Sequence, residues 1–407
     1  MQNVLSPLTD YCRYTYREKF LMVLLACFAI FVTSCTETDL TPTEATLSTN
    51  ESLSIYEFSH RMILSRVGLS NTLKKVDAYH LKPGPQANNH GFASPLFGLA
   101  TAPNGDILVA DAGAGIATFY GTDISLPGVT DIGPIGRSSL WATTGAGEDP
   151  TMDTGQALYR VSQGKTQMIV NLFTFEQAAD PDGIVDSNPF DVQSLGGQAA
   201  LVADAGGNTL LKVNNKGNVE VLAIFPDELV STANIKNLFG CPSGPPDICG
   251  LPEMIPAQAV PTSIALGPDG YYYVGELKGF PAPTGASNIW RVSPDASNAI
   301  CGSSPDCIKV FAGGFTSIID LGFDASGVLH VVELDEQSWF AVEFFDPATL
   351  AGGAIKACDV GSLDCHEIAA GIPIITAITW GKDGSLWATQ NALIPGLAEV
   401  IKVPQPI

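Results

Sequence analysis

Positively charged residues are scarce in this sequence. Its 407 residues include 20 Lys and Arg against 42 Asp and Glu, which gives a formal net charge of −22. Proteins bind nucleic acids largely through Lys and Arg that neutralise phosphates, and basic segments likewise hold proteins on anionic membrane surfaces. The shortage of basic residues therefore argues against nucleic acid as a partner, and against direct binding to an anionic membrane surface.

Charged residues of both signs are few, and runs without turn-forming residues are short. Charged residues make up 15% of the chain and hydrophobic residues 45%, a balance that forms a core rather than a disordered chain. With 41 Gly and 28 Pro, the sequence is interrupted by turns throughout, which argues against long helical bundles. The length allows two or three ordinary domains or one large all-β domain.

Common enzyme motifs are missing from the sequence. It contains no Gly-x-Ser-x-Gly elbow, and His366-Glu367 has no second His at the spacing of a His-Glu-x-x-His zinc motif. Gly164-Lys165-Thr166 lacks the upstream Gly of a phosphate-binding loop, and none of the five His has a recognisable nucleophile partner. The sequence therefore offers no catalytic residue.

The N-terminal segment has the form of an export signal. Basic residues precede an apolar run at 20–32, which suits a signal-peptide core but is short for a membrane span. The run ends in Val-Thr-Ser followed by Cys35, which is similar to a bacterial lipobox, and a Thr-, Ser- and Glu-rich tether follows. An ordinary signal peptide with an incidental Cys is the alternative. We expect Cys35 to be lipidated and to anchor the protein in the membrane of the bacterial cell envelope, facing the periplasm or the cell surface.

The remaining cysteines agree with export to an oxidising compartment. Apart from three in the N-terminal segment, they fall into three close pairs across Gly- or Pro-containing turns: Cys241 with Cys249, Cys301 with Cys307, and Cys358 with Cys365. The spacing favours three local disulfide bonds. A zinc site is the alternative, but there is no Cys-x-x-Cys and no His at finger spacing.

A repeated phrase predicts the fold. It consists of a short apolar strand, a Gly-containing turn, and a second apolar strand that ends in a polar residue. In the six copies the second strands end at Asp111, Thr144, Asp204, Glu276, Glu333 and Gln390. Two more strand-like runs follow several copies, and four short strands per repeat are typical of a β-propeller blade. We therefore predict an all-β, six-bladed β-propeller with four-stranded blades; a β-sandwich or solenoid is the alternative, which the Asp-Gly and Asn-Gly hairpins disfavour.

The last repeat lacks a strand. After it only one strand-like run, at 398–403, remains, so the sixth blade would leave an open edge. The run at 75–82 alternates like a strand, and we expect it to close the ring by pairing with 398–403. The predicted domains are a lipoprotein signal peptide at 1–34, a tether and neck at 35–74, and the propeller at 75–407.

At this point the sequence resembles the ScyD/ScyE family of exported proteins, with a wider similarity to NHL-repeat propellers. Two stretches carry the resemblance, DSNP followed by VADAGGN within 181–213, and VGELKGFPAPTGA within 260–292. The likeness covers roughly 75–403 and implies a six-bladed propeller outside the cytoplasm. It does not supply a reaction. The second repeat departs most from the pattern, and a Cys-containing insertion at 226–259 adds to it.

The ends of the second strands give the first candidate site. In a propeller they lie on one face around the central channel, so Asp111, Asp204, Glu276 and Glu333 would ring one mouth of the channel, with Asp186 and Asn188 nearby. Four converging carboxylates could bind a cation or a polar ligand. Alternatively, each could cap the turn that follows by accepting backbone N–H bonds.

The second candidate is the acidic loop DPDGIVDSNP at 180–189. Its carboxylates at alternating positions with a Gly resemble a calcium-binding loop, although the terminal Glu of an EF-hand is missing. We take Asp182, Asp186 and Asn188 as candidate metal ligands and calcium as a possible cofactor. A solvated acidic turn is the alternative.

Two functional hypotheses remain. The first is a lipid-anchored binding or accessory propeller that holds a small molecule or an envelope protein at the channel mouth. The second is a calcium-dependent hydrolase, similar to the lactonase and gluconolactonase propellers. For that class, Asn188 and Asp320 are the only candidate ligands near the starts of the inner strands.

Overall fold

The structure is a computed structural model that describes residues 91–118, 124–147 and 149–404. The chain separates into two units, Met1–Thr49 and Asn50–Ile407, and every described residue belongs to the second. The predicted signal peptide, Cys35, the tether and the expected closing strand at 75–82 lie outside the described residues. Within the described part of the chain, no helix is both long and apolar enough to cross a membrane.

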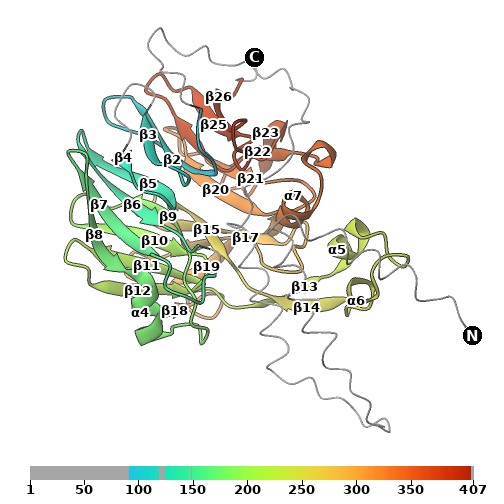
Figure 1. The fold of residues 1–407 in the computed structure, drawn as a ribbon. Coiled ribbons are helices and arrows are strands. Elements are labelled where there is room, and N and C mark those ends of the chain that lie inside the picture. The colour runs from blue at the N-terminus through green and yellow to red at the C-terminus, as the bar shows by residue number, and fades with distance from the viewer. Residues whose placement is uncertain (1–90, 119–123, 148, 405–407) are drawn as a thin grey trace, which may run out of the picture. The chain divides into compact units, whose positions relative to one another are not determined.

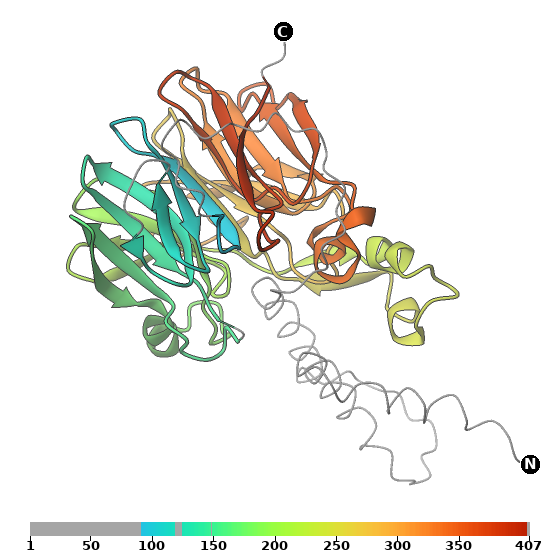
Figure 2. The same ribbon diagram turned by 45° about the horizontal axis from the view of Figure 1, so that its top comes forward.

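The described residues form a six-bladed β-propeller, which confirms the predicted fold class. The blades follow one another along the chain, from cyan to red in Figures 1 and 2. The strands of the first three blades are β1 (Leu96–Thr101), β2 (Ile107–Asp111), β3 (Gly115–Thr118) and β4 (Ile124–Ser125); β5 (Val129–Gly136), β6 (Ser139–Thr144), β7 (Ala157–Ser162) and β8 (Lys165–Asn171); and β9 (Pro189–Ser194), β10 (Ala199–Asp204), β11 (Thr209–Asn214) and β12 (Val219–Ile224).

The other three blades repeat this antiparallel order from the channel outward. Their strands are β15 (Pro261–Leu266), β16 (Tyr272–Glu276), β17 (Ser287–Val292) and β19 (Cys307–Phe315); β20 (Ile318–Phe323), β21 (Leu329–Glu333), β22 (Gly353–Cys358) and β23 (Cys365–Ile372); and β24 (Ile378–Trp380), β25 (Leu386–Gln390) and β26 (Glu399–Lys402). Blade six thus has three strands among the described residues, and its predicted fourth strand falls outside them.

Alternation within each strand explains how blades stack. In β10, Leu201 and Ala203 pack against blade four, whereas Ala200 and Val202 pack against blade two. Successive side chains of a strand point to opposite faces of the sheet, so a strand that is covered by a neighbouring blade on both sides must be apolar at every position. This requirement accounts for the uninterrupted apolar second strands that define the repeat.

The turns between the first two strands depend on glycine. Gly105 in the Asn-Gly turn has a φ of 97°, and Gly270 in the Asp-Gly turn has a φ of 82°. Residues with a Cβ rarely adopt this left-handed region. The repeated Gly is therefore a requirement of the tight hairpin.

Threonines on blades two, four and six each link their blade to the inner strand of the next blade. The Oγ1 atom of Thr130 donates to the Pro189 carbonyl at 2.8 Å, that of Thr262 to Ile318 at 2.7 Å, and that of Thr376 to Leu96 at 2.7 Å. The last of these bonds joins blade six to blade one, across 280 residues of sequence. The ring is thus closed at its inner strands within the described residues.

The remaining elements decorate the blades. A ribbon of β13 (Glu228–Ser231) and β14 (Met254–Ala257) carries α5 (Ala233–Leu238) and α6 (Pro246–Cys249) and extends away from the blades (Figure 1). The others are α4 (Leu172–Ala179) before blade three, β18 (Ala299–Ile300), which pairs with β12, and α7 (Trp339–Phe344) with the 3-10 helix η1 (Pro347–Thr349) in blade five.

All three predicted disulfide bonds are present. The Cys241–Cys249 bond closes the loop between α5 and α6, with the Cα atoms 5.5 Å apart. Cys301–Cys307 lies in the connection from β17 to β19 in blade four, and Cys358–Cys365 joins β22 to β23 in blade five, with Cα separations of 4.7 and 4.1 Å. Local pairing of neighbouring cysteines is therefore confirmed.

Candidate functional site

The predicted acidic column lies at the ends of the second strands, where the repeat places it. Asp111, Asp204, Glu276 and Glu333 are the last residues of β2, β10, β16 and β21. All four are buried, with exposed fractions from 0% to 3%. Their chemistry therefore depends on the partners that the surrounding loops provide.

Asp111 and Asp204 accept hydrogen bonds from turns. Asp111 binds the backbone N–H groups of Ala93 and Gly113, at 2.7 and 3.1 Å. Asp204 accepts from the Ser187 hydroxyl and the Asn188 N–H, both at 2.6 Å. Burial raises the pKa of both carboxyl groups, and these hydrogen bonds oppose the rise. Both side chains tie the segment before the inner strand to the end of the second strand.

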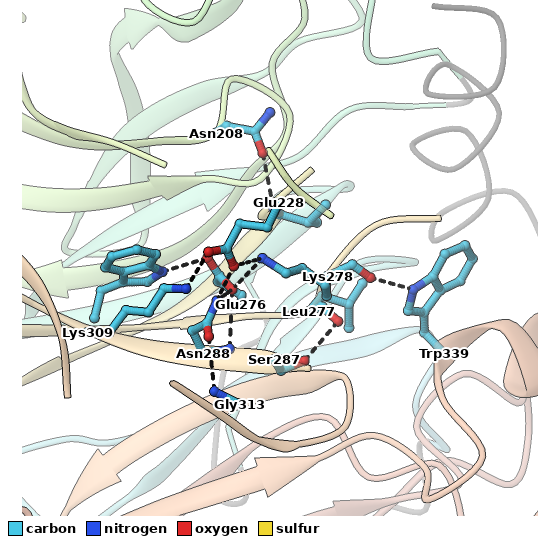
Figure 3. Close-up of polar contacts among 12 residues, drawn as sticks. Asn208, Glu228, Glu276, Leu277, Lys278, Ser287, Asn288, Lys309, Gly313 and Trp339 are labelled. Atoms are coloured by element: carbon cyan, nitrogen blue, oxygen red, sulfur yellow. Dashed lines mark hydrogen bonds and ion pairs between the residues drawn. The ribbon is translucent and has the colours of Figure 1, made fainter. Parts of the chain in front are cut away.

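Glu276 lies within a dense polar network (Figure 3). Its carboxylate accepts from Trp290 Nε1 at 2.5 Å, Asn288 Nδ2 at 2.6 Å and Lys278 Nζ at 2.9 Å. Lys278 is fully buried and also pairs with Glu228 at 2.8 Å. Burial alone would lower the pKa of Lys278, but the charges of the two glutamates outweigh burial and raise it.

Glu228 connects this network to the inserted ribbon. It is the first residue of β13, and it accepts from Lys278, Asn288 and Lys309. Burial would raise the pKa of Glu228, but its hydrogen bonds to the two lysines dominate and hold it at about 2. The network therefore fastens the insertion to blade four.

Glu333 also has its own partners. Its Oε1 atom accepts from the Thr316 N–H at 2.6 Å, and Oε2 pairs with Lys356 at 2.7 Å. Of the six predicted ligand residues, the structure brings Asp186, Asn188 and Asp204 together around the start of blade three. Asp111, Glu276 and Glu333 are held separately, each by groups of its own blade or of the segments next to it.

A cavity of about 210 Å³ runs along the channel and is lined by the inner strands of all six blades. At the end next to the acidic column, Phe97, Phe190 and Ile319 are buried, and the two phenyl rings pack edge to face with centroids 5.5 Å apart. At the other end, Thr101 and Gln193 are partly exposed. Apolar side chains thus plug the channel beside the column, and the cavity is accessible from the hairpin side.

Three carboxyl groups line this cavity at one level of the inner strands. Each accepts an N–H from the inner strand of the next blade: Asp131 from Val192 at 3.1 Å, Asp191 from Ile264 at 2.5 Å, and Asp320 from Ile378 at 2.7 Å. The sequence analysis noted Asp320 but missed Asp131 and Asp191. Aligning the first strands would have found them, because Asp is the third residue of β5, β9 and β20 alike.

Asp131 and Asp191 share a proton. Burial raises the pKa of Asp131 well above its usual range, and the charge of Asp191 and the hydrogen bond to it raise it further. Burial also raises the pKa of Asp191, but the same hydrogen bond lowers it, so Asp131 holds a proton more strongly than Asp191 does. Burial and the charge of Asp191 likewise raise the pKa of Asp320. The cavity therefore offers both hydrogen-bond donors and acceptors.

The acidic loop is joined by a residue that sequence reasoning missed. Glu176 of α4 has carboxylate atoms within 4.8 Å of ligand atoms from Asp180 and Asp182, so these three could hold a cation. Asp182 also accepts from Asn208 Nδ2 at 3.0 Å, whereas the amide oxygen of Asn188 accepts the Ala146 N–H at 2.9 Å. The helical i to i+4 spacing of Glu176 and Asp180 is the signal that could have added Glu176 to the loop.

The carboxyl groups in and around this acidic loop repel one another. Burial, followed by the charges of Asp204, Asp182 and Asp180, raises the pKa of Glu176 to about 9. Burial is also the main cause that raises the pKa of Asp182 to about 6, and that of Asp186 well above its usual range. A bound cation would relieve this repulsion.

The two parts of one specific sequence stretch, DSNP and VADAGGN, meet here. A Cβ at Gly206 would lie 2.7 Å from the backbone N of Asn188, so only glycine allows the VADAGGN turn to approach the DSNP segment. Asn208 takes a φ of 46°, a conformation that Asn tolerates better than most residues. The resemblance stated above thus rests on residues that contact one another.

No protein-family model and no curated protein matches the sequence. Solved structures with a similar arrangement include the calcium-binding protein regucalcin from Agrobacterium tumefaciens (15% identity, TM-score 0.47, covering 79% of this chain and 94% of that one). Virginiamycin B lyase from Staphylococcus aureus is similar too (14%, 0.41, covering 77% and 86%), as is a protein of unknown function from Bacteroides thetaiotaomicron (10%, 0.45, covering 76% and 69%).

Proposed function

We propose that this chain is an exported, lipid-anchored propeller of the ScyD/ScyE type that binds a small polar molecule outside the cytoplasm. The observation that carries the proposal is the central cavity, which is lined by polar and apolar side chains from all six blades. Sites for small molecules are concave and mostly apolar, with a few well-placed polar groups. The cavity is concave and has such polar groups in Asp131, Asp191 and Asp320, and its lining is more polar than is usual for these sites.

The cavity also limits the class of ligand. Its volume of about 210 Å³ is below the roughly 300–1,000 Å³ of sites for drug-sized ligands, so the ligand is small. The three carboxyl groups present acceptors, and Asp131 and Asp320, whose pKa values are raised well above their usual range, present donors when they are protonated. We propose a ligand with N–H or O–H groups, such as a small amine or polyol.

Export and anchoring rest on the sequence. The lipobox-like Val-Thr-Ser before Cys35 supports a lipid anchor in the bacterial cell envelope, and the three disulfide bonds suit an oxidising compartment. The membrane is then a partner through the lipid alone, and an envelope protein could bind the outer surface of the propeller.

Filling the cavity tests ligand binding. Gln193→Trp places an indole in the partly exposed end of the cavity, and Gln198→Trp places one on the exposed hairpin of the same blade as a control. In a thermal-shift screen of small amines, amino acids and polyols, we expect hits for the wild type and the control that disappear in Gln193→Trp. Hits that survive in Gln193→Trp would move the ligand site out of the cavity.

A calcium-dependent hydrolase, such as a lactonase, is the second candidate, and calcium is the cofactor that we propose for either function. The three carboxyl groups at one level of the cavity favour the hydrolase, because they could polarise or deprotonate a bound substrate. Hydrolysis in a panel of lactones that is lost in Asp320→Asn would support it. If no lactone in the panel is hydrolysed, with calcium present or chelated, a binding protein remains the function that we propose.

A further inference from the structure

We propose that Glu176, Asp180 and Asp182 bind one calcium ion between α4 and blade three, with the buried carboxyl group of Asp186 next to them. This inference deepens the calcium part of the proposed function by naming the ligands. It also changes the donor set expected from the sequence. Glu176 and Asp180 enter, Asp186 lies beside the set, and Asn188 leaves because its amide oxygen accepts the Ala146 N–H.

Buried oxygen atoms without partners carry the inference. Glu176 is 0% exposed, and neither of its carboxylate oxygens has a hydrogen-bond partner among the described residues. Asp186 is 3% exposed, and within the same part of the chain its Oδ1 atom also lacks a partner. Buried polar atoms are nearly always hydrogen-bonded, so unpaired ones indicate a missing water or ion. Three such atoms on two neighbouring acids indicate an ion.

The spacing of the oxygen atoms suits calcium. Ligand oxygens lie about 2.3–2.6 Å from a calcium ion, so any two ligands of one ion are at most about 5 Å apart. Glu176, Asp180 and Asp182 offer oxygen atoms that all lie within 4.8 Å of one another. They could therefore contact one ion with only small side-chain adjustments.

The backbone holds these acids in place. Asp180 ends α4 with a φ of 41°, and its N–H donates to the Glu176 carbonyl at 2.8 Å. Asp182 is fixed by the Ile184 N–H and by Asn208 Nδ2, both at 3.0 Å. A Cβ at Gly207 would lie 3.1 Å from Glu176 Oε2, so glycine leaves room beside that carboxylate. The three ligands thus come from one helix end and the loop that follows it.

The donor chemistry selects the ion. Three carboxylates without His or Cys suit a hard cation and do not suit zinc, which prefers nitrogen and sulfur. Magnesium demands near-ideal octahedral geometry and keeps several waters, whereas calcium accepts irregular, carboxylate-rich sites. The raised pKa of Glu176, at about 9, agrees with an excess of negative charge that a divalent ion would offset.

Calorimetry on the full chain, purified in detergent and stripped with EDTA, tests the site. CaCl2 is titrated into the wild type, Glu176→Gln and Asp180→Asn, with MgCl2 as the comparison ion and melting temperature as a second readout. Glu220→Gln is the matched control, because it removes one charge from an exposed position on β12 of the same blade. Asp180 is exposed, so its variant remains informative if Glu176→Gln fails to fold.

We expect CaCl2 to bind the wild type and Glu220→Gln with equal affinity and to raise their melting temperatures. Glu176→Gln and Asp180→Asn should bind at least tenfold more weakly, and MgCl2 should bind less well than CaCl2. Unchanged affinity in both variants would overturn this ligand set while leaving calcium in the proposed function. If the wild type releases or absorbs no heat with CaCl2, and metal-free Glu176→Gln melts at a higher temperature, Glu176 is a neutral buried acid. That result would overturn both the ligand set and the calcium part of the proposed function.

Discussion

Lys278 holds a positive charge out of contact with solvent, between the carboxylates of Glu276 and Glu228. Removing ions from water is costly, and their mutual attraction offsets that cost only when both partners are present. Lys309 and Glu228, at the partly exposed end of the same network, differ from the buried pair because water competes for both of their charges. Similar ion pairs in one network therefore have different effects on stability.

Lys278→Met should lower the free energy of unfolding by about 3–5 kcal/mol, because it leaves Glu276 buried without its cation. Lys309→Met, at a side chain that is 28% exposed, should cost less than about 1 kcal/mol. Urea denaturation measures both. The double variant Glu276→Gln with Lys278→Met should recover part of the loss, and equal costs for the two single variants would contradict this account.

Asp131 predicts a dependence of stability on pH. Its pKa is raised in the folded protein, so the folded state binds this proton more tightly than the unfolded chain does. The resulting stabilisation is complete below the ordinary pKa of 3.8 and is lost as pH rises through the raised value. We expect the free energy of unfolding to fall over that window, and to fall less in Asp131→Asn.

The control for this prediction is Asp306→Asn, which changes an exposed aspartate in a turn of blade four. It should follow the wild-type pH profile. A wild-type profile that is flat over this window, or that Asp131→Asn leaves unchanged, would show that the Asp131–Asp191 pair does not hold the proton.

Blade six is the one blade in which the third strand, β26, has no fourth strand beside it in the described residues. The outermost strand of a blade exposes unpaired N–H and C=O groups, which invite aggregation unless they are covered. The strand expected at 75–82 would pair with this edge, and that pairing remains a prediction.

Two deletions test the closure. Removing 36–60 should leave the melting temperature unchanged, because it shortens only the predicted tether. Removing 36–84 should lower the melting temperature and cause aggregation, because the edge of β26 loses its expected partner. Light scattering and thermal unfolding compare the two proteins, and an unchanged melting temperature in the longer deletion would refute the closure.

Elements were easier to predict than contacts between them. The alternation of apolar residues and the Asp-Gly and Asn-Gly turns are local, so the strands, the six-fold repeat and the disulfide pairs could be predicted. Whether Asp111 or Glu333 faces a ligand depends on the segments before the inner strands, which supply the N–H groups of Ala93 and Thr316. No local pattern predicts that approach.

At the scale of the whole molecule, the same limit explains what was missed at the sites. Asp131 and Asp191 meet because consecutive blades stack, and Glu176 reaches the acidic loop because α4 folds back beside blade three. Local patterns mark these residues as candidates, but which of them contact one another depends on the packing of elements. The sequence specifies that packing only through the complete fold.

The anchor is a prediction about the whole molecule in its cell. Cys35→Ala should abolish labelling by a fatty-acid analogue and leave the protein uncleaved or soluble, because the thiol is the expected acceptor of the lipid. Metabolic labelling followed by membrane fractionation measures this. Labelling that survives the substitution would contradict the lipobox, and Cys27→Ala is the matched control within the same segment.

The bond from Thr376 to Leu96 makes the first blade depend on the last. A chain that emerges N-terminus first from a ribosome or a translocon cannot form this contact until nearly all of its blades have been delivered. Contacts between residues so distant in sequence slow folding. The early blades must therefore wait with one flank uncovered, which makes them targets for proteases and holding chaperones during synthesis. Slow completion of the ring would also keep the chain unfolded long enough to be threaded through a membrane.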